Sequence, residues 1–117
     1  MVNRSSRELD RVFHALADAT RRRILLQVTR ADCTVGELSR PFTLSPAAIS
    51  KHLKVLESAG ILCRIKDGKF HRFRLDTRPF TKAQQLMEEL TSYWQQRLDR
   101  LENYLDSEST SKQQKAR

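Results

Sequence analysis

The sequence contains little glycine, proline or cysteine. Its 117 residues include three glycines, three prolines and two cysteines. Three glycines leave little material for an active site built on loops, and no glycine-rich phosphate-binding loop is present. No Ser/His/Asp set, Cys/His set or pair of carboxylates is spaced for catalysis. These absences argue against an enzyme.

Long apolar runs are also missing. No stretch approaches the roughly 18–20 apolar residues that span a membrane, and the first ten residues lack the apolar core of a signal peptide. We therefore expect a cytoplasmic protein without a membrane partner, in which Cys33 and Cys63 are reduced thiols. Residues 1–105 are long enough for one domain. Residues 106–117 are almost entirely polar and are expected to be a disordered tail.

The surplus of positive charge is confined to the middle of the chain. Residues 20–75 contain 12 Lys and Arg against 4 Asp and Glu, whereas residues 1–19 and 76–117 are each balanced, so the whole net charge of +8 lies in the central block. A cationic block between neutral flanks indicates one surface that meets a polyanion. The expected partner is double-stranded DNA.

Three short helices are predicted before residue 41. Apolar residues at helical spacing place the first over residues 6–17. Asp18 or Thr20 can cap the second, whose buried side includes Ile24 and Leu25. The third covers about residues 35–40 and ends before Pro41, which disfavours helical geometry in the residue that precedes it.

The best-defined helix begins after Ser45. The Ser45 hydroxyl is suited to capping the helix, Pro46 suits the first helical position, and Gly60 provides the stop. One side of this helix is an apolar stripe at i, i+4 and i+7. The opposite side is small, polar and cationic, as a helix lying in a major groove requires; it consists of Ala47, Ser50, Lys51, Lys54 and Ser58.

A β-hairpin follows this helix. Two β-prone segments, ILCRIK and KFHRFRL, flank Asp67-Gly68, a strong signal for a two-residue turn. That turn pairs Lys66 with Lys69 and lines the arms with further cations. Like charges opposite one another are unfavourable unless an anion relieves them. A hairpin that is simply solvated is the alternative.

Pro79 precedes a long final helix, predicted over about residues 80–105, which completes the domain. Its apolar residues, two Tyr and one Trp among them, form a stripe too wide for one small domain to cover, which favours a homodimer with help from the first helix. The alternatives are a helix folded onto its own domain and a different protein partner. Arg97 lies inside the stripe and should either snorkel or meet a carboxylate across the interface. The predicted dimer residues are Leu9, Phe13, Leu86, Leu90, Trp94, Arg97, Leu98 and Leu101.

The order of these elements resembles the winged helix–turn–helix repressors of the ArsR/SmtB family. Three segments carry the resemblance: LADATRRRILLQV (16–28), VGELSRPFTLSPAAISKHLKVLESAGIL (35–62) and KDGKFHRFRL (66–75). The resemblance implies a mainly α fold with a small β-hairpin wing, dimerisation through the terminal helices, and a transcriptional repressor that binds an inverted repeat.

The metal sites of that family do not carry over. Its arsenic sensors use Cys-Val-Cys on the third helix, where this chain has TVGEL (34–38), and its zinc sensors use a His on the final helix, which here has none. The three histidines and two cysteines form no evident ligand set. The resemblance is to the metal-independent branch, and neither metal nor cofactor is expected.

The candidate DNA contacts fall into two groups. Short side chains and one lysine on the helix after Ser45 are candidates for base edges: Ser45, Ala47, Ser50 and Lys51. Candidates for phosphates are Lys54, Arg22, Thr34, Lys66, Lys69 and Arg72. His52 is either a DNA contact or a packed, hydrogen-bonded histidine. A thiol- or metal-responsive repressor of the same fold, or a non-specific nucleic-acid-binding protein, is the alternative function.

Overall fold

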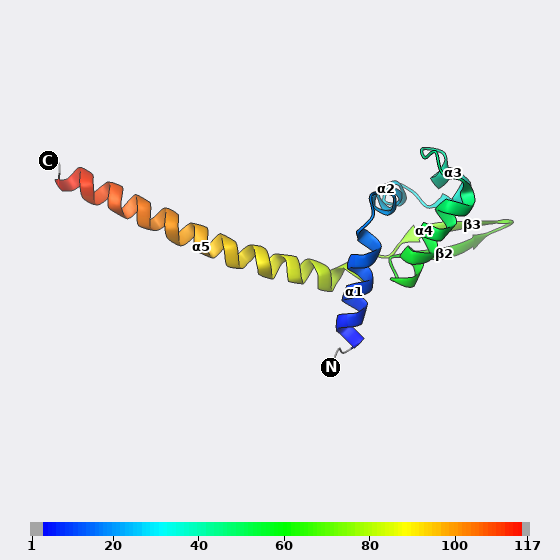
Figure 1. The fold of residues 1–117 in the computed structure, drawn as a ribbon, viewed down its shortest axis with the longest axis horizontal. Coiled ribbons are helices and arrows are strands. Elements are labelled where there is room, and N and C mark those ends of the chain that lie inside the picture. The colour runs from blue at the N-terminus through cyan, green and yellow to red at the C-terminus, as the bar shows by residue number, and fades with distance from the viewer. Residues whose placement is uncertain (1–3, 116–117) are drawn as a thin grey trace. The chain divides into compact units, whose positions relative to one another are not determined.

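The computed structural model describes the backbone of residues 4–115 and the side chains of residues 4–110. The chain divides into two compact units, Met1–Ala83 and Gln84–Arg117. The elements are α1 (Arg4–Leu16), α2 (Ala19–Val28), β1 (Cys33–Thr34), α3 (Val35–Ser39), α4 (Pro46–Ser58), β2 (Leu62–Asp67), β3 (Phe70–Leu75) and α5 (Phe80–Lys115) (Figure 1). The predicted mainly α fold with a small hairpin wing is confirmed.

Side-chain caps explain where the short helices begin. Asp18, rather than Thr20, caps α2 by accepting from the backbone N–H of Arg21 at 3.0 Å. Thr34 and Glu37 form a reciprocal capping box at the start of α3. Ser45 caps α4 by accepting from the Ala48 N–H, with Pro46 in the first turn as predicted.

One apolar core holds the first unit together. It takes buried side chains from every helix and from the sheet, and no polar side chain is buried among the described residues. Ile49, Leu53 and Leu56 are fully buried, which confirms the apolar stripe predicted for α4. The buried core consists of Val12, Ala15, Ile24, Leu25, Val28, Leu38, Ile49, Leu53, Leu56, Ile61, Leu62, Phe73 and Ala83.

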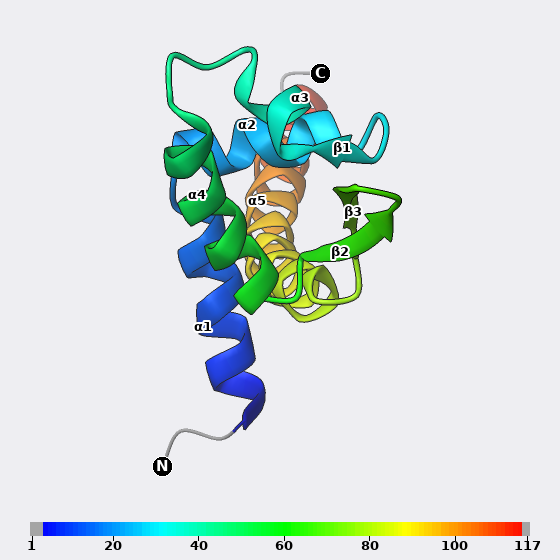
Figure 2. The same ribbon diagram turned by 90° about the vertical axis from the view of Figure 1, so that its right-hand side faces the viewer.

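The wing is a three-stranded antiparallel sheet in the order β1-β3-β2. The hairpin of β2 and β3 lies beside α4 (Figures 1 and 2). Strand β1 was not predicted; its two residues pair with Phe73 and Arg72 of β3. This third strand ties the hairpin to the segment that leads into α3.

The predicted turn register is wrong by one residue. Asp67 pairs with Phe70 and Lys66 with His71, so the two turn residues are Gly68 and Lys69, and Lys66 does not face Lys69. Gly68 has φ +61°, and no non-glycine residue of the described chain has a positive φ. An Asp-Gly type I′ turn needs positive φ at both central residues, whereas a type II′ turn needs it only at the first. The glycine therefore takes the first central position.

The expected repulsion between wing cations is also corrected. Each of three wing arginines has a carboxylate partner instead of facing another cation. Arg64 pairs with Glu57 at 2.9 Å, Arg72 with Asp67 at 2.8 Å, and Arg74 with Asp32 at 2.9 Å. Two of the three acids come from outside the hairpin, which is why a pattern within the hairpin could not reveal them.

Helix α5 extends to Lys115, about ten residues beyond its predicted end. Residues 106–115, expected to be a disordered tail, are helical in the structure, whereas 116–117 lie outside the described residues. Hydrogen bonds four residues apart, such as that from Tyr104 to Glu108 at 3.1 Å, support this extension. No helix within the described residues is long and apolar enough to cross a membrane.

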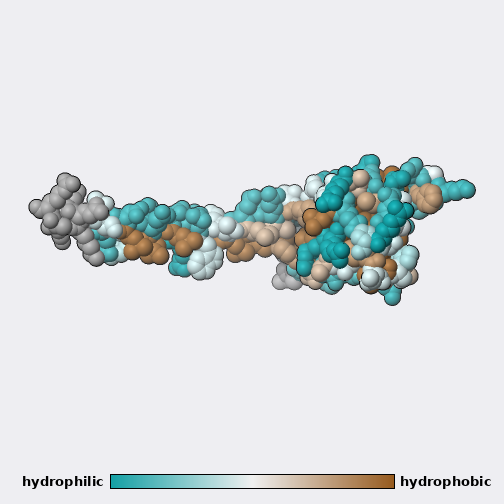
Figure 3. All heavy atoms as spheres, turned by 90° about the horizontal axis from the view of Figure 1, so that it is seen from above, coloured by the Kyte–Doolittle hydropathy of each residue, from teal (hydrophilic) through white to brown (hydrophobic). Residues whose placement is uncertain are grey.

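The apolar stripe of α5 is exposed. Figure 3 shows apolar residues gathered along one side of this helix. Every large apolar side chain from Met87 to Leu105 is 53–62% exposed, including Trp94 at 62%. The described residues of the second unit therefore contain no buried core of their own.

Candidate nucleic-acid interface

The outer face of α4 is open to solvent. Ala47, Lys51 and Lys54 are exposed, and Ser50 is half-buried at the edge of the face. Ser45 is exposed at the start of the helix, where its oxygen accepts the capping hydrogen bond and its hydroxyl hydrogen remains available to donate. The structure thus brings together the four predicted base-edge candidates on one short, accessible surface.

The lysines and the wing arginines of this surface differ in whether they form ion pairs. Within residues 4–115 no ion pair involves Lys51, Lys54, Lys66 or Lys69. The wing arginines, by contrast, are all held by acids. Exposed ion pairs contribute only about 0–1 kcal/mol, so a phosphate could displace the carboxylate from a wing arginine. As far as the structure describes the chain, the lysines have no carboxylate partner to displace. The four lysines can therefore contact an anion without giving up an ion pair.

The His52 side chain is partly buried against neighbouring residues and does not lie on the outer face of α4. Its Nδ1 lies 3.3 Å from Nη1 of Arg21 and 3.9 Å from the carboxylate of Asp18, and its side chain is 24% exposed. Arg21 also donates to the carbonyls of Ala15 and His14 at the end of α1. This arrangement favours the packed, hydrogen-bonded interpretation of His52 over a DNA contact.

Two predicted phosphate contacts are engaged in local hydrogen bonds. Arg22 is exposed and donates to the carbonyl of Leu16 at 2.8 Å. Thr34 is half-buried, and both its backbone N–H and its hydroxyl donate hydrogen bonds to the Glu37 carboxylate. Hydrogen bonds from Thr34 are the main reason why the pKa of Glu37 is lowered, with Arg72 and Arg40 adding to the effect. Glu37 is therefore a charged anchor between α3 and the wing.

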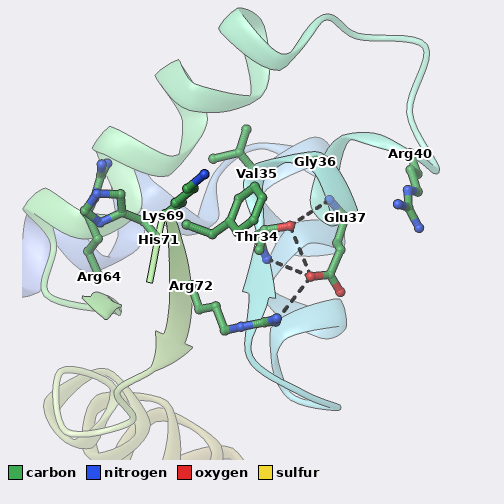
Figure 4. Close-up of a pocket in the computed structure, with 10 residues that line it drawn as sticks. Thr34, Val35, Gly36, Glu37, Arg40, Arg64, Lys69, His71 and Arg72 are labelled. Carbon is green, nitrogen blue, oxygen red and sulfur yellow. Dashed lines mark hydrogen bonds and ion pairs between the residues drawn. The ribbon is translucent and has the colours of Figure 1, made fainter. Parts of the chain in front are cut away.

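A groove lies between α3 and the wing, with a volume of about 580 Å³. Figure 4 shows Glu37 bonded to Thr34 on one wall and to Arg72 on the other, the latter at 3.3 Å. The α3–wing groove is lined by Thr34, Val35, Gly36, Glu37, Arg40, Arg64, Lys69, Phe70, His71 and Arg72. Its lining contains four Lys or Arg and one carboxylate, so it favours an anion.

Arg40 and Phe70 are among the groove residues that sequence reasoning missed. Arg40 follows α3 and makes no hydrogen bond or ion pair within the described chain, although its charge lowers the pKa of Glu37. Phe70 lies beside the wing turn and is 65% exposed. The alternation along β3 could have suggested an outward Phe70, but its place opposite α3 depends on tertiary structure.

The cysteines give little support to a thiol switch. Burial is the main cause that raises the pKa of the Cys33 thiol, and Glu37 and Asp32 raise it further. The cationic neighbourhood expected to lower it is outweighed. Cys33 and Cys63 belong to strands separated by β3, so about 9–10 Å lies between their backbones, beyond the roughly 7 Å that a disulfide bridges.

No metal-binding group is assembled in the part of the chain that the structure describes. No three or more His, Cys, Asp or Glu side chains lie close enough there to hold an ion. Thr34 and Glu37 belong to the TVGEL segment (34–38), which stands where the family's arsenic sensors have Cys-Val-Cys. In this chain the two residues form the capping box at the start of α3.

The predicted dimer residues fall into two sets. Leu9 packs partly against the core and Phe13 is 37% exposed, whereas Leu90, Trp94, Leu98 and Leu101 are more than half exposed. Leu86 is half-buried. Arg97 is exposed in the single chain, and its guanidinium lies 5.1 Å from the ring centroid of Tyr93, a cation–π contact; a carboxylate across an interface stays a prediction.

Comparison with known proteins agrees with this geometry. Residues 18–63, which include α2, α3 and α4, match the family model described as bacterial regulatory protein, arsR family. The chain is 36% identical over 102 residues to the HTH-type transcriptional regulator Rv2034 of Mycobacterium tuberculosis, covering 87% of this chain and 92% of that protein. It is 35% identical to the transcriptional repressor SdpR of Bacillus subtilis, covering 59% of this chain and 77% of that protein.

A solved structure gives the same result. The ArsR-like transcriptional regulator from Rhodococcus sp. RHA1 superposes with a TM-score of 0.72 at 32% identity, covering 92% of this chain and 98% of that one. The likenesses to Rv2034 and to the Rhodococcus structure cover 87% and 92% of the chain, so they extend beyond the helix–turn–helix alone. The chain therefore belongs to the arsR family and is a DNA-binding transcriptional regulator with a winged helix–turn–helix fold.

Proposed function

We propose that this chain is a homodimeric repressor that binds an inverted-repeat operator. The observation that carries the proposal is the exposed apolar stripe of α5. It combines aliphatic residues with Tyr93, Trp94 and Tyr104, all more than half exposed in the single chain. A patch of this length and composition favours burial against a second protein surface. Two copies of α5 satisfy this need symmetrically, as in most soluble homo-oligomers.

The outer face of α4 is proposed to read base edges in the major groove. Lys51 is long enough to reach a guanine, while Ser45, Ala47 and Ser50 allow the helix to approach closely. Lys54 and the wing lysines would contact phosphates, which set the position of the helix without reading sequence. Two such helices, related by the dimer axis, fit half-sites spaced by about one helical turn or a multiple of it.

Control of the repressor is proposed to be independent of metal. The donor sets that hold a soft metal or zinc are not assembled by the described residues, and the two cysteines are separated by a strand. A regulator that acts on chromosomal DNA works in the cytoplasm and needs no catalytic group. Neither a cofactor nor a membrane is part of the proposed function.

Footprinting on the DNA upstream of its own gene tests the operator. We expect a protected site with two-fold symmetry; protection without symmetry would overturn the homodimeric arrangement. Competition with random DNA separates a specific repressor from a non-specific binding protein. Affinity should also fall steeply with salt, because several phosphates are neutralised by each dimer.

Lysine substitutions separate the reading helix from the wing. Lys51→Ala should relax base preference in a selection from random DNA, whereas Lys69→Ala should weaken all sequences about equally. Lys82→Ala, which removes a lysine that pairs with Glu8 on α1, is the matched control and should preserve the base preference. Equal losses for Lys51→Ala across all sequences would remove Lys51 from the reading face.

A further inference from the structure

Another pocket lies between α1 and α4, away from the α3–wing groove. Its volume is about 270 Å³, just below the roughly 300–1,000 Å³ of typical ligand pockets. The two helices pack against each other within the first unit (Figure 2). A pocket of this size suits a small metabolite. This α1–α4 pocket is lined by Arg11, His14, Lys54, Val55, Ser58 and Ala59.

The α1–α4 pocket carries positive charge without a compensating acid. Arg11 and Lys54 contribute cations, His14 adds ring nitrogens, and no acidic residue lines the pocket in the part of the chain that the structure describes. Among the described residues no ion pair holds Arg11 or Lys54. In the α3–wing groove, by contrast, the carboxylate of Glu37 already pairs with Arg72. An anion therefore meets less competition in the α1–α4 pocket.

The floor of the α1–α4 pocket is apolar. Val55 and Ala59 are half-buried, pack against the core and contribute apolar surface beside the cations. An exposed ion pair alone stabilises a complex by only about 0–1 kcal/mol, so a small inorganic ion would be held weakly. Apolar surface buried in the same pocket adds to the affinity. The combination favours an organic anion, in which a carboxylate or phosphate is attached to a short apolar group.

The α1–α4 pocket shares residues with the outer face of α4. Lys54 and Ser58 belong to that face, and Lys54 is a proposed phosphate contact. An anion held by Lys54 occupies this lysine and places negative charge beside the helix that approaches DNA, which opposes binding of the phosphate backbone. We propose that the α1–α4 pocket binds a small organic anion and that this binding releases the repressor from DNA. The regulatory part of the inference rests on the proposed function.

The proposed dimer contacts lie elsewhere on α1. At 3.6 residues per turn, Arg11 lies on the opposite side of α1 from Leu9 and Phe13. His14 follows Arg11 by three residues and therefore lies near it on the helix surface. No described residue of α5 lines the pocket. Each copy in the proposed dimer can thus bind its own anion.

An NMR titration of the isotope-labelled full chain with phenyl phosphate, without DNA, tests the site. We expect saturable shifts at Arg11, Val55 and Ala59, with a Kd of roughly 0.1–1 mM. Inorganic phosphate should bind about tenfold more weakly, because it lacks the apolar group. Shifts centred on other residues, or no saturable shifts, would overturn the proposal. Equal binding of both probes would indicate an adventitious ion only and would overturn it as well.

Arginine variants locate the anion in the pocket. Arg11→Ala should weaken phenyl phosphate binding about tenfold, whereas Arg11→Lys should retain most of it. Arg30→Ala removes an exposed arginine outside the pocket; it is the matched control and should bind like wild type. Thermal unfolding should be similar for all four proteins, because both arginines are exposed. Equal weakening in Arg11→Ala and Arg30→Ala would contradict the proposed site.

DNA titrations at constant ionic strength test the release. With phenyl phosphate at about ten times its Kd, wild-type DNA affinity should fall about tenfold for each occupied site, whereas sulfate should have no such effect. Arg11→Ala should bind DNA like wild type yet lose this response. An unchanged wild-type affinity would overturn the release.

The same titrations distinguish a small anion from DNA as the occupant of the pocket. Weakened DNA binding by Arg11→Ala without phenyl phosphate would place a DNA phosphate there and would overturn the proposal. These titrations use any duplex that the wild type binds. If the wild type shows no symmetric operator, the proposed function fails, yet the NMR titration still decides whether the pocket binds an organic anion.

Discussion

The two units of this chain treat apolar side chains in opposite ways. In the winged unit, 13 apolar residues from every helix and from the sheet are buried at 0–7% exposure. Along α5 after Gln84, every large apolar residue from Met87 to Leu105 is more than half exposed. Leucine thus stabilises the first unit from within, whereas the Leu, Tyr and Trp residues of α5 are exposed and leave the second unit without a core.

This difference in burial indicates that the apolar residues of the winged unit serve its folding, whereas those of α5 are available for the proposed assembly. The winged unit buries enough apolar surface to hold α4 and the wing in place without another chain. The second unit is a single helix, and a helix alone buries almost nothing, so the proposed dimer would supply the burial that its stripe lacks. The proposed DNA reading and the proposed dimerisation therefore depend on different sets of residues, and substitutions should affect one without the other.

The largest expected effect is in the winged core. Phe73→Ala removes a fully buried ring and should lower the free energy of unfolding by about 3–5 kcal/mol. Urea denaturation at two protein concentrations measures it. The loss should not depend on concentration, whereas the smaller loss caused by Leu101→Ala on α5 should diminish as the protein is diluted. Concentration-dependent losses of the same size in both variants would break the distinction between the units.

Charge on the α5 stripe should separate the two copies. In the double variant Trp94→Glu/Leu98→Glu, carboxylates occupy the proposed interface, and we expect about a 100-fold loss of operator affinity because each chain then binds one half-site alone. Circular dichroism should show that the winged unit remains folded. Ser92→Glu/Gln96→Glu, which places the same charges on the polar side of α5, is the matched control and should bind DNA nearly as well as wild type.

Removing the cap of α4 should have an intermediate effect. Ser45→Ala deletes the oxygen that accepts from the Ala48 N–H, which costs about 1 kcal/mol of stability. DNA affinity should fall as well, because the same hydroxyl lies on the reading face. Thermal unfolding and DNA titration measure the two losses, and Thr43→Ala, just before the cap, is the control. Unchanged stability in Ser45→Ala would show that the cap does not hold this helix.

The smallest expected effect concerns acid stability at the junction before α5. Hydrogen bonds from the Arg78 side chain and backbone lower the pKa of Asp76 from 3.8 to about 2. A lowered folded-state pKa stabilises the protein above pH 4, and this contribution disappears as the pH falls towards 2. Urea midpoints between pH 5 and pH 2 should therefore depend less on pH in Asp76→Asn. Asp10→Asn serves as the control; identical profiles for Asp76→Asn and wild type would contradict this assignment.

Local signals in the sequence predicted much of the winged unit. Ser45, Pro46 and Gly60 mark α4 because caps and stops act within a few residues of the helix ends. The wing turn was placed one residue too early, since both Asp67-Gly68 and Gly68-Lys69 satisfy a glycine signal and only backbone φ separates them. Strand β1 has two residues, too few for a periodic pattern.

The site was predictable where one helix face defines it. Lys51 and Lys54 follow from the wheel of α4 alone, and the stripe of α5 follows from its period. The partners of the wing arginines, the packed His52 and the α3–wing groove depend on segments up to 42 residues apart. Arg40 and Phe70 carry no local signal for their shared groove, because only the folded sheet places the wing beside α3.

Sedimentation equilibrium of the full chain without DNA tests the central claim most directly. The account predicts a mass of twice 13.6 kDa at micromolar concentrations, reverting to 13.6 kDa in Trp94→Glu/Leu98→Glu. A wild-type chain that sediments as a single copy across that range would contradict the claim that α5 joins two reading helices into one repressor.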